Sequence, residues 1–171
     1  DIGAVSDEWN GFNVLHTAAS RVGGLDLEFV PGEGGLSTGG IQDAAAKGDV
    51  DVVFLLGADE LDMSSFGDAF VVYIGTHGDR GAHRADAILP GAAYTEKSGT
   101  YVNLEGRVQL ASRAAFPPGD AREDWAIIRA LSGALGKPLA FNTFAQLRAA
   151  VVEAVPHMAN VNGIATGQAS D

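Results

Sequence analysis

Hydrophobic residues in this chain form three short continuous runs, at residues 50–56, 70–74 and 87–89. The runs are rich in β-branched residues, and each is followed or closed by glycine or proline. Continuous rather than alternating hydrophobicity is typical of parallel strands that helices bury on both faces. The pattern therefore predicts an α/β fold with three such strands.

Other segments have hydrophobic residues at helical spacing. The first predicted helix spans residues 9–22 and is stopped by two glycines at 23–24. A glycine-rich loop at 31–40 follows, and a short helix is predicted at 41–47. After the third hydrophobic run, residues 100–103 and 108–110 are predicted to be extended around a turn.

Two more helices are predicted after this turn. One has Asp120 as its N-cap, with Glu123 three residues later, and is expected to bury Trp125, Ile128, Leu131 and Leu135. The other begins with a capping box of Thr143 and Gln146 and has an apolar stripe of Phe144, Leu147, Val151 and Val155. Together the elements predict one α/β domain, or a fragment of one, over residues 1–157 and a disordered tail over 158–171.

Composition limits the chemistry that these 171 residues can perform. There is no cysteine, which excludes disulfides, cysteine-bound iron–sulfur clusters and cysteine nucleophiles within them. No apolar run approaches the roughly 18 residues of a membrane span, so we expect no direct insertion into a bilayer. Since the chain begins with aspartate and shows no secretory leader, we expect either a processed protein or an internal or C-terminal piece of a longer one.

The net charge of −11 argues against nucleic acid as a partner. Residues 1–70 contain 13 acidic side chains against Arg21 and Lys47, whereas residues 71–171 contain nine of each sign. Two interpretations fit this asymmetry: an acidic face that docks against a basic partner, or a solvated surface.

Three segments are candidates for chemistry. Gly32 and Gly34 begin a dinucleotide-type fingerprint, but Ser37 stands where its third glycine belongs and Glu33 would repel a pyrophosphate. A mobile surface loop is therefore the better interpretation of this segment.

The second candidate lies just after a predicted strand and consists of His77, Asp79, His83 and Asp86. Imidazole and carboxylate groups at the carboxyl end of a strand are where α/β folds place sites. Zinc, however, usually has three protein ligands with supporting contacts, and no third histidine is near. Loop histidines that hydrogen-bond to the backbone explain the cluster equally well.

The third candidate is a polar group formed by Glu96, Lys97, Asn103, Glu105 and Arg107. In one interpretation, the lysine and Arg107 bind an anionic ligand. In the other, the segment is rich in turns, Asn103 sets the turn geometry together with a glycine at 106, and Glu96 pairs with Arg107.

An ordered series of motifs runs along residues 9–157. The motifs are Asn13-Val-Leu-His-Thr-Ala-Ala-Ser-Arg-Val22, Leu55-Leu-Gly-Ala-Asp59, His77-Gly-Asp79, Ala85-Asp-Ala-Ile-Leu-Pro-Gly-Ala-Ala-Tyr-Thr-Glu-Lys97, Gly99-Thr-Tyr-Val-Asn103, Glu105-Gly-Arg107, Pro117-Pro-Gly119, Ala121-Arg-Glu-Asp-Trp125 and Ile127-Ile-Arg-Ala-Leu-Ser132. This series closely resembles one family, the large iron–sulfur subunit of respiratory complex I, known in bacteria as NADH–quinone oxidoreductase. The resemblance concerns the C-terminal part of that subunit.

The resemblance implies part of a molybdopterin-oxidoreductase-like domain, with a Rossmann-like, mostly parallel sheet flanked by helices and with C-terminal helices. It implies that this domain has lost its cofactor and that the 2Fe-2S and 4Fe-4S clusters of the parent subunit lie outside this segment. We therefore expect no catalytic, cofactor-binding or metal-binding residue in this chain. Of the two interpretations of the group around Glu96 and Arg107, the resemblance implies the turn, inherited within the family.

The resemblance also implies a function and a location. We expect a structural segment of the peripheral arm of an assembly that transfers electrons from NADH through FMN and iron–sulfur clusters to quinone, coupled to proton translocation. Its partners are the other peripheral-arm subunits and the upstream part of its own subunit. The location is the cytoplasmic face of a bacterial inner membrane or the matrix side of the mitochondrial one. The alternatives are a module that still binds a pterin or nucleotide, and an independent acidic docking protein.

Overall fold

The structure, a computed structural model, describes residues 3, 5–7, 11–12, 14–19 and 21–163. It forms two compact units, each with a hydrophobic core of its own. The sheet unit contains Val30–Ser98 and Ser112–Leu147, and the hairpin unit contains Asp1–Phe29, Gly99–Ala111 and Arg148–Asp171. The prediction of one domain, or a fragment of one, over residues 1–157 stays a prediction.

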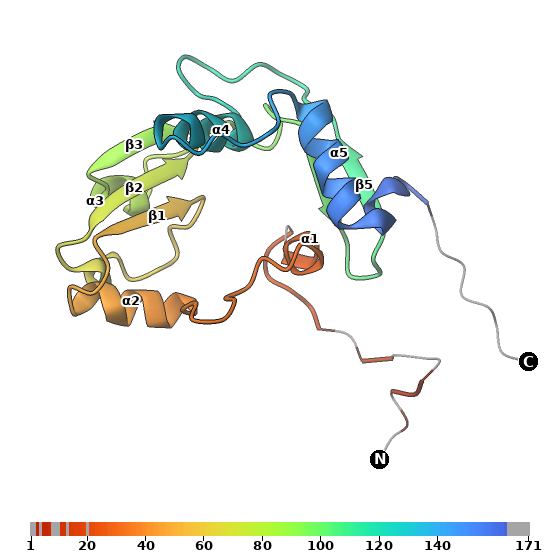
Figure 1. Cartoon of the computed structure of the whole chain (residues 1–171), viewed down its shortest axis with the longest axis horizontal. Coiled ribbons are helices and arrows are strands. Elements are labelled where there is room, and N and C mark those ends of the chain that lie inside the picture. The colour runs from red at the N-terminus through yellow and green to blue at the C-terminus, as the bar shows by residue number, and fades with distance from the viewer. Residues whose placement is uncertain (1–2, 4, 8–10, 13, 20, 164–171) are drawn as a thin grey trace, which may run out of the picture. The chain divides into compact units, whose positions relative to one another are not determined.

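Figure 1 labels most of the helices and strands. The strands are β1 (Val52–Leu56), β2 (Phe70–Gly75), β3 (Ala87–Pro90), β4 (Gly99–Val102) and β5 (Val108–Ala111). The α-helices are α1 (Arg21–Asp26), α2 (Thr38–Ala46), α3 (Arg80–Arg84), α4 (Asp124–Ala134) and α5 (Phe144–Ala154). The short 3-10 helices are η1 (Met63–Phe66) and η2 (Pro156–Ala159).

The sheet unit is built on a parallel sheet with the strand order β1-β2-β3. Val52 lies opposite Phe70, and Val72 lies opposite Ala87. The short elements η1 and α3 connect the strands along the chain. The predicted α/β fold with parallel strands at these positions is therefore confirmed.

One face of this sheet forms the main core. The side chains of Val53, Leu55, Val71 and Tyr73 point to this face because residues alternate between the two sides of a strand. They pack with residues of α2, of η1 and of the turn before β2, namely Ala45, Phe66 and Ala69. Each of these core residues is buried.

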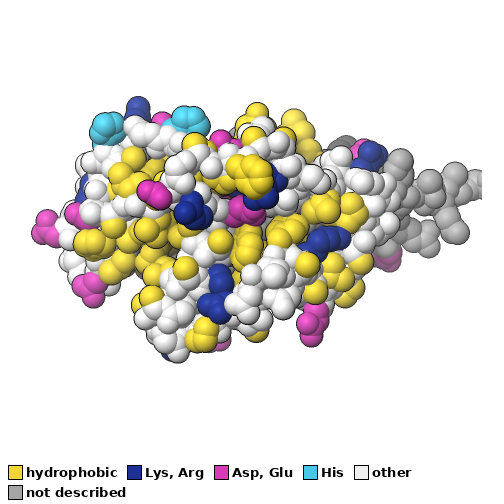
Figure 2. All heavy atoms as spheres, turned by 90° about the horizontal axis from the view of Figure 1, so that it is seen from above, with side chains coloured by type: hydrophobic (Ala, Val, Ile, Leu, Met, Phe, Trp, Pro, Cys, Tyr) yellow, Lys and Arg dark blue, Asp and Glu magenta, His cyan; other side chains and the backbone are white. Residues whose placement is uncertain are grey.

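The opposite face of the sheet differs from the prediction. On β1, the side chains of this face, Val52, Phe54 and Leu56, remain 48%, 49% and 49% exposed. On β3, Ile88 pairs with Tyr73 and so lies on the core face, yet it remains 52% exposed. By contrast, the residues of β2 from 71 to 74 are buried on both faces. Burial on both faces is thus confirmed for β2 and wrong for β1 and β3. Hydrophobic side chains accordingly reach the surface at several places in Figure 2.

Arg84 holds the connections of the sheet together. Its Nη2 donates to the carbonyl oxygens of Gly67 and Ala69, each at 2.9 Å, and its Nη1 donates to Asp86 Oδ2 at 3.1 Å. The same carboxylate accepts a 2.8 Å hydrogen bond from the backbone N–H of Val71. This backbone bond, assisted by Arg84, lowers the pKa of Asp86.

The hairpin unit contains the antiparallel pair β4–β5. In the connecting turn, Asn103 Oδ1 accepts from the backbone N–H groups of Glu105 and Arg107 at 3.0 and 2.9 Å. Gly106 has a φ of 77°, a left-handed conformation that glycine adopts without strain. The two extended segments, and the role of Asn103 and Gly106 in the turn between them, are confirmed.

The core of the hairpin unit joins distant segments: its buried residues are Val102, Val108, Val155 and Met158. Met158 and Val161, from the segment predicted as a tail, take part in this packing, and Val161 also forms a bridge with Val108. Residues 164–171 lie outside the described residues, so disorder there stays a prediction.

Two predicted N-terminal helices are shifted. In the described part of residues 9–22 the chain is not helical before α1, and the predicted stop at Gly23 and Gly24 lies inside that helix. Residues 9, 10, 13 and 20 lie outside the described residues. The helix predicted at 41–47 begins earlier, at Thr38, because the side chain of Ser37 caps it by accepting from the N–H of Gly40.

The C-terminal helices were predicted more accurately in position than in burial. The N-cap of α4 is Glu123, not the predicted Asp120. No side chain of α4 is buried in this chain, so the predicted burial of its apolar stripe is wrong. In α5, the N–H of Gln146 bonds to Thr143 Oγ1 as predicted, but the Gln146 side chain accepts from the N–H of Asn142. No helix within the described residues is long and apolar enough to cross a membrane.

Candidate functional site

The edge of the sheet where the three parallel strands end is the candidate site, because open α/β sheets bind ligands outside their carboxyl ends. Glycine follows or ends the strands at this edge: Gly57 after β1, Gly75 in β2 and Gly91 after β3. The N–H of Gly57 bonds to Ile74 O, and that of Gly91 bonds to Gly75 O, both at 2.8 Å. These bonds extend the pairing of the strands just past their ends.

Tyr73 fills the space beneath this edge. The residue is only 2% exposed, and its ring lies against two glycines, Gly75 and Gly81. A Cβ atom at Gly81 would lie 2.7 Å from two ring carbons, and one at Gly75 would overlap the ring. The two glycines therefore make room for the aromatic ring between β2 and α3.

Acidic side chains surround this ring. Burial raises the pKa of the Tyr73 hydroxyl, and the negative charges of Asp79, Asp59 and Glu60 raise it further. These carboxylates follow β1 and β2 directly in sequence. These three carboxylates therefore place negative charge near the buried ring.

An ion pair lies close to Gly91, the residue that follows β3. Lys97 Nζ contacts Asp124 Oδ2, and both side chains are about three-quarters buried, with 27% and 28% exposed. Asp124 is the first residue of α4, where a carboxylate also complements the helix dipole. The N–H of Ala92 bonds to Arg122 O, and the N–H of Arg122 bonds to Pro90 O. These two bonds place the segment just before α4 beside the end of β3.

The predicted histidine–aspartate cluster does not converge. His77 follows β2 and its Nδ1 hydrogen-bonds with Thr76 Oγ1 at 2.7 Å, whereas Asp86 binds the N–H of Val71 near the other end of β2. Over the ranges that the structure describes, no three His, Cys, Asp or Glu side chains are placed to hold one metal ion. The prediction that this chain has no metal-binding residue stays a prediction.

The predicted pairing of Glu96 with Arg107 is wrong. Glu96 Oε2 accepts from the N–H of Ala93 at 2.9 Å, and Arg107 lies 3.9 Å from Glu105. Lys97, predicted in one interpretation to bind an anion, is instead paired with Asp124. Turn formation and local capping therefore account for most of this polar group.

The glycine-rich loop leads into α2 and does not follow a strand. Ser37, which stands in place of the third glycine of the fingerprint, is the N-cap of this helix. A dinucleotide fingerprint requires the strand–loop–helix order, so this segment lacks its structural context.

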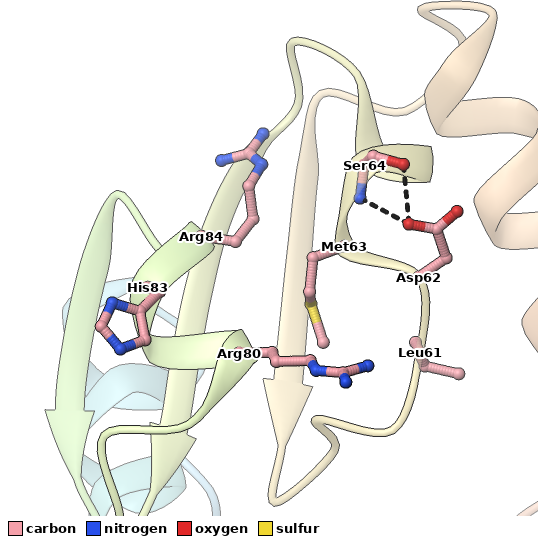
Figure 3. A pocket seen from close by; sticks show the side chains of 7 residues that line it. All are labelled: Leu61, Asp62, Met63, Ser64, Arg80, His83 and Arg84. Carbon is pink, nitrogen blue, oxygen red and sulfur yellow. Dashed lines mark hydrogen bonds between the residues drawn. The ribbon is translucent and has the colours of Figure 1, made fainter.

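Two shallow pockets lie in the sheet unit. The first has a volume of about 420 Å³ and is lined by Leu61, Asp62, Met63, Ser64, Arg80, His83 and Arg84. In Figure 3 the side chains of His83 and Arg84 point away from Arg80, so these basic groups do not converge on one ligand. The second has about 310 Å³ and lies beside Phe116, whose ring stacks under Arg113 at 4.5 Å.

Sequence reasoning did not single out Tyr73, Gly81 or Asp124. The spacing Tyr73-x-Gly75 was a usable signal, because residues two apart share one face of a strand. The approach of Gly81 and the pairing of Asp124 with Lys97 join positions that are not adjacent in sequence, and no local pattern marks them.

The three-stranded parallel sheet and the helices that flank it define an α/β domain. Residues 1–134 match the molybdopterin oxidoreductase family, and the chain belongs to this family. Among solved structures, the chain is similar to the acetylene hydratase from Pelobacter acetylenicus, with a TM-score of 0.50 and 22% identity, covering 57% of this chain and 15% of that one. This likeness concerns the fold alone.

The similarity to curated proteins identifies relatives more specifically than the fold does. The chain is 48% identical to the NADH-ubiquinone oxidoreductase 75 kDa subunit of Reclinomonas americana over 93% of its own length and 22% of that subunit. It is 52% identical to the mitochondrial 78 kDa subunit of Candida albicans, over 90% and 20% of the two chains. It is 45% identical to the corresponding NADH-quinone oxidoreductase subunit of Rickettsia bellii, over 92% and 22%. The chain thus spans about a fifth of the length of these relatives, which confirm the resemblance stated above.

Proposed function

We propose that this chain is a structural segment, without a redox cofactor of its own, of the large subunit in the peripheral arm of an NADH–quinone oxidoreductase. The parent assembly transfers electrons from NADH through FMN and iron–sulfur clusters to quinone and couples this transfer to proton translocation. The main support is the identity of 45% to 52% with subunits of this kind over at least nine-tenths of the chain.

The geometry at the carboxyl edge of the sheet supports the absence of a pterin cofactor. The family name implies a molybdopterin, whose phosphate groups require basic side chains or free N–H groups. At this edge Asp59, Glu60 and Asp79 are acidic, and Lys97 is paired with Asp124. These carboxylates would repel an anionic cofactor, and we assign the described residues no catalytic role.

The interactions of this chain support a role in assembly. Arg129 in α4 donates to Phe141 O at 3.0 Å and to Asn142 Oδ1 at 2.8 Å, which joins the helix to the segment before α5. Hydrogen bonds from a charged group contribute about 1.5–3 kcal/mol each to stability. Contacts of this kind maintain a rigid module on which neighbouring segments can pack.

Its partners in this proposal are the other peripheral-arm subunits and the upstream part of its own subunit. In this proposal the 2Fe-2S and 4Fe-4S clusters belong to that other part, and the lack of cysteine in the present residues supports this assignment. The segment is peripheral to the membrane, on the cytoplasmic side in a bacterium or on the matrix side in a mitochondrion.

A native gel of membranes from the source organism tests this proposal. The gel is stained for NADH oxidation and probed with an antibody to this chain, and a denaturing second dimension gives the size of the reacting polypeptide. We expect reactivity in the large NADH-oxidising band, on a polypeptide several times heavier than 17.6 kDa. A free soluble protein of 17.6 kDa would refute the proposal and favour an independent acidic docking protein.

Paired variants separate a structural role from a chemical one. Arg129→Ala is expected to lower the amount of assembled complex while leaving turnover per assembled complex unchanged. Arg107→Ala is the control, because its 3.9 Å ion pair with Glu105 is weak and its role in the turn uses its backbone N–H, which donates to Asn103 Oδ1. Normal assembly of Arg129→Ala with lost turnover would contradict the structural role.

The family match favours one alternative, a module that retains a pterin. Elemental and pterin analysis of the purified complex distinguishes the two. Molybdenum or tungsten at a near-stoichiometric level would support the alternative, whereas we expect neither.

A further inference from the structure

The second pocket of the sheet unit, which we call the Arg122 pocket, combines aromatic and charged side chains in one place. All of its lining residues belong to Ser112–Leu147, so they lie within a single compact unit. Most of them come from the motifs at 117–119 and 121–125, to which the proposed function assigns no role. The lining includes Phe116, Pro117 and Trp125 as apolar groups and Arg113, Arg122 and Glu123 as charged ones.

Two of the three charges in this pocket offset each other. Glu123 Oε2 accepts from Trp125 Nε1 at 2.7 Å, and Glu123 Oε1 lies 3.5 Å from Arg113 Nη1. The guanidinium of Arg113 in turn stacks on the ring of Phe116, 4.5 Å from its centroid. Glu123 is therefore already satisfied by groups of the pocket itself, and it holds Trp125 and Arg113 in place.

Arg122 supplies the charge that remains. Its Nη1 donates to Gly119 O at 3.2 Å and to Ala121 O at 2.9 Å, which fixes the position of the guanidinium. Within the described ranges, Arg122 forms no ion pair with a carboxylate. A guanidinium has five N–H donors in a planar fork that matches the geometry of a carboxylate. The pocket therefore presents one oriented positive group beside an apolar lining.

The composition and size of the pocket favour a protein partner. Arginine, tryptophan and phenylalanine are enriched at protein–protein interfaces, and arginine and tryptophan dominate binding hot spots. The volume of about 310 Å³ is at the lower end of the range of about 300–1,000 Å³ that small-molecule sites have. Such a space suits an apolar side chain with a carboxylate next to it.

We propose that the Arg122 pocket binds an acidic segment of another polypeptide of the peripheral arm. An aspartate or glutamate of that segment pairs with Arg122, and an apolar side chain beside it packs against Phe116 and Trp125. The complementary charge sets the register of the segment on the pocket. This inference rests on the proposed function, which supplies the neighbouring polypeptides.

The test uses the complete subunit in its assembled complex. Phe116 is replaced by the photo-crosslinker p-benzoylphenylalanine, which preserves an aromatic side chain at a position that is 81% exposed. After irradiation of the membranes, the crosslinked peptides are identified by mass spectrometry. We expect a gain in subunit mass and capture of one segment of a different polypeptide, in which an acidic residue adjoins an apolar one.

The control is the same replacement at Leu135, which is 69% exposed and follows the last residue of α4, whereas the pocket lies at the start of this helix. It should not capture the segment that Phe116 captures. Capture of that segment from both positions would overturn the proposal. Capture from Phe116 of a segment of the same polypeptide, of a segment without an acidic residue, or of nothing would overturn it as well.

A charge exchange tests Arg122 itself. In the variant with the crosslinker at Phe116, Arg122→Glu should lower the yield of the captured segment roughly tenfold, because repulsion replaces a charged hydrogen bond. Changing the captured acidic residue to lysine should then restore most of the yield. Because Arg122→Glu also removes the bonds to Gly119 and Ala121, a loss that the exchange does not restore would indicate a merely structural arginine. That result, or an unchanged yield in Arg122→Glu, would refute the pairing.

The two proposals fail in different ways. If the native polypeptide proves to be only 17.6 kDa, the proposed function fails before any crosslink is sought. If the polypeptide is long and lies in the NADH-oxidising complex, but Phe116 captures no acidic segment of another polypeptide, only the present inference fails.

Discussion

The packing of Tyr73 against two glycines allows a quantitative test at the candidate site. We consider the substitution Gly81→Ala. The new Cβ would lie 2.7 Å from two carbons of the Tyr73 ring, about 1 Å closer than the ordinary separation of about 3.5–4.0 Å between carbon atoms. Because Tyr73 is 2% exposed, its ring cannot swing into solvent, and the contact must be relieved by shifts in β2 or α3.

Two opposing effects determine the sign of the stability change. Overpacking a well-packed core costs about 1–3 kcal/mol. Replacing glycine by alanine inside a helix gains up to about 1 kcal/mol, and Gly81 lies in α3 without a left-handed backbone. We therefore expect Gly81→Ala to lower the free energy of unfolding by about 1–2 kcal/mol.

A double-mutant cycle isolates the contact. In the background Tyr73→Leu the ring is gone, so Gly81→Ala should become neutral or stabilising by up to about 1 kcal/mol. The free energies are measured by urea unfolding followed by circular dichroism, and Gly24→Ala, where an added Cβ meets nothing within 4 Å, is the helical control. Equal effects of Gly81→Ala in both backgrounds would refute the argument.

Three further predictions concern pH and the second core. Burial and nearby carboxylates raise the pKa of Tyr73 above its ordinary 10.0. The contribution of the neutral hydroxyl to stability is therefore complete below pH 10 and is lost as the pH rises further. Urea unfolding from about pH 8 to 11 should show a smaller loss of unfolding free energy in Tyr73→Phe. The N–H of Val71, with help from Arg84, lowers the pKa of Asp86 below 3.8. The stabilisation by the Asp86 carboxylate is therefore present above that pH and is lost as the pH falls. Asp86→Asn should show a smaller decrease of the unfolding free energy between about pH 5 and 2, and an unchanged decrease would contradict this. Met158 is 1% exposed in the core of the hairpin unit, so Met158→Ala should lower the free energy of unfolding by about 2–5 kcal/mol. His157→Ala, at an exposed position, should lower it far less, and equal losses from the two variants would count against the assigned core.

Local patterns in the sequence determined much of this protein. The hydrophobic runs located β1, β2 and β3 within two residues, because each strand is a short apolar run rich in β-branched residues and bounded by glycine or proline. The hairpin and its turn followed from Asn103 and Gly106, whose preferences act over a few residues. The ordered motifs also placed the chain in its family, which the relatives confirmed.

The tertiary structure decided what local patterns do not contain. Glu96 and Arg107 looked like an ion pair in sequence, yet each interacts with other groups, and Lys97 instead pairs with Asp124, 27 residues away. Burial on the two faces of β1 depends on which segments pack there, and the ring of Tyr73 meets Gly81 only after α3 folds back. Hydrophobic periodicity and turn chemistry act along the chain, whereas ion pairing and burial depend on proximity in space, which only the packed fold establishes.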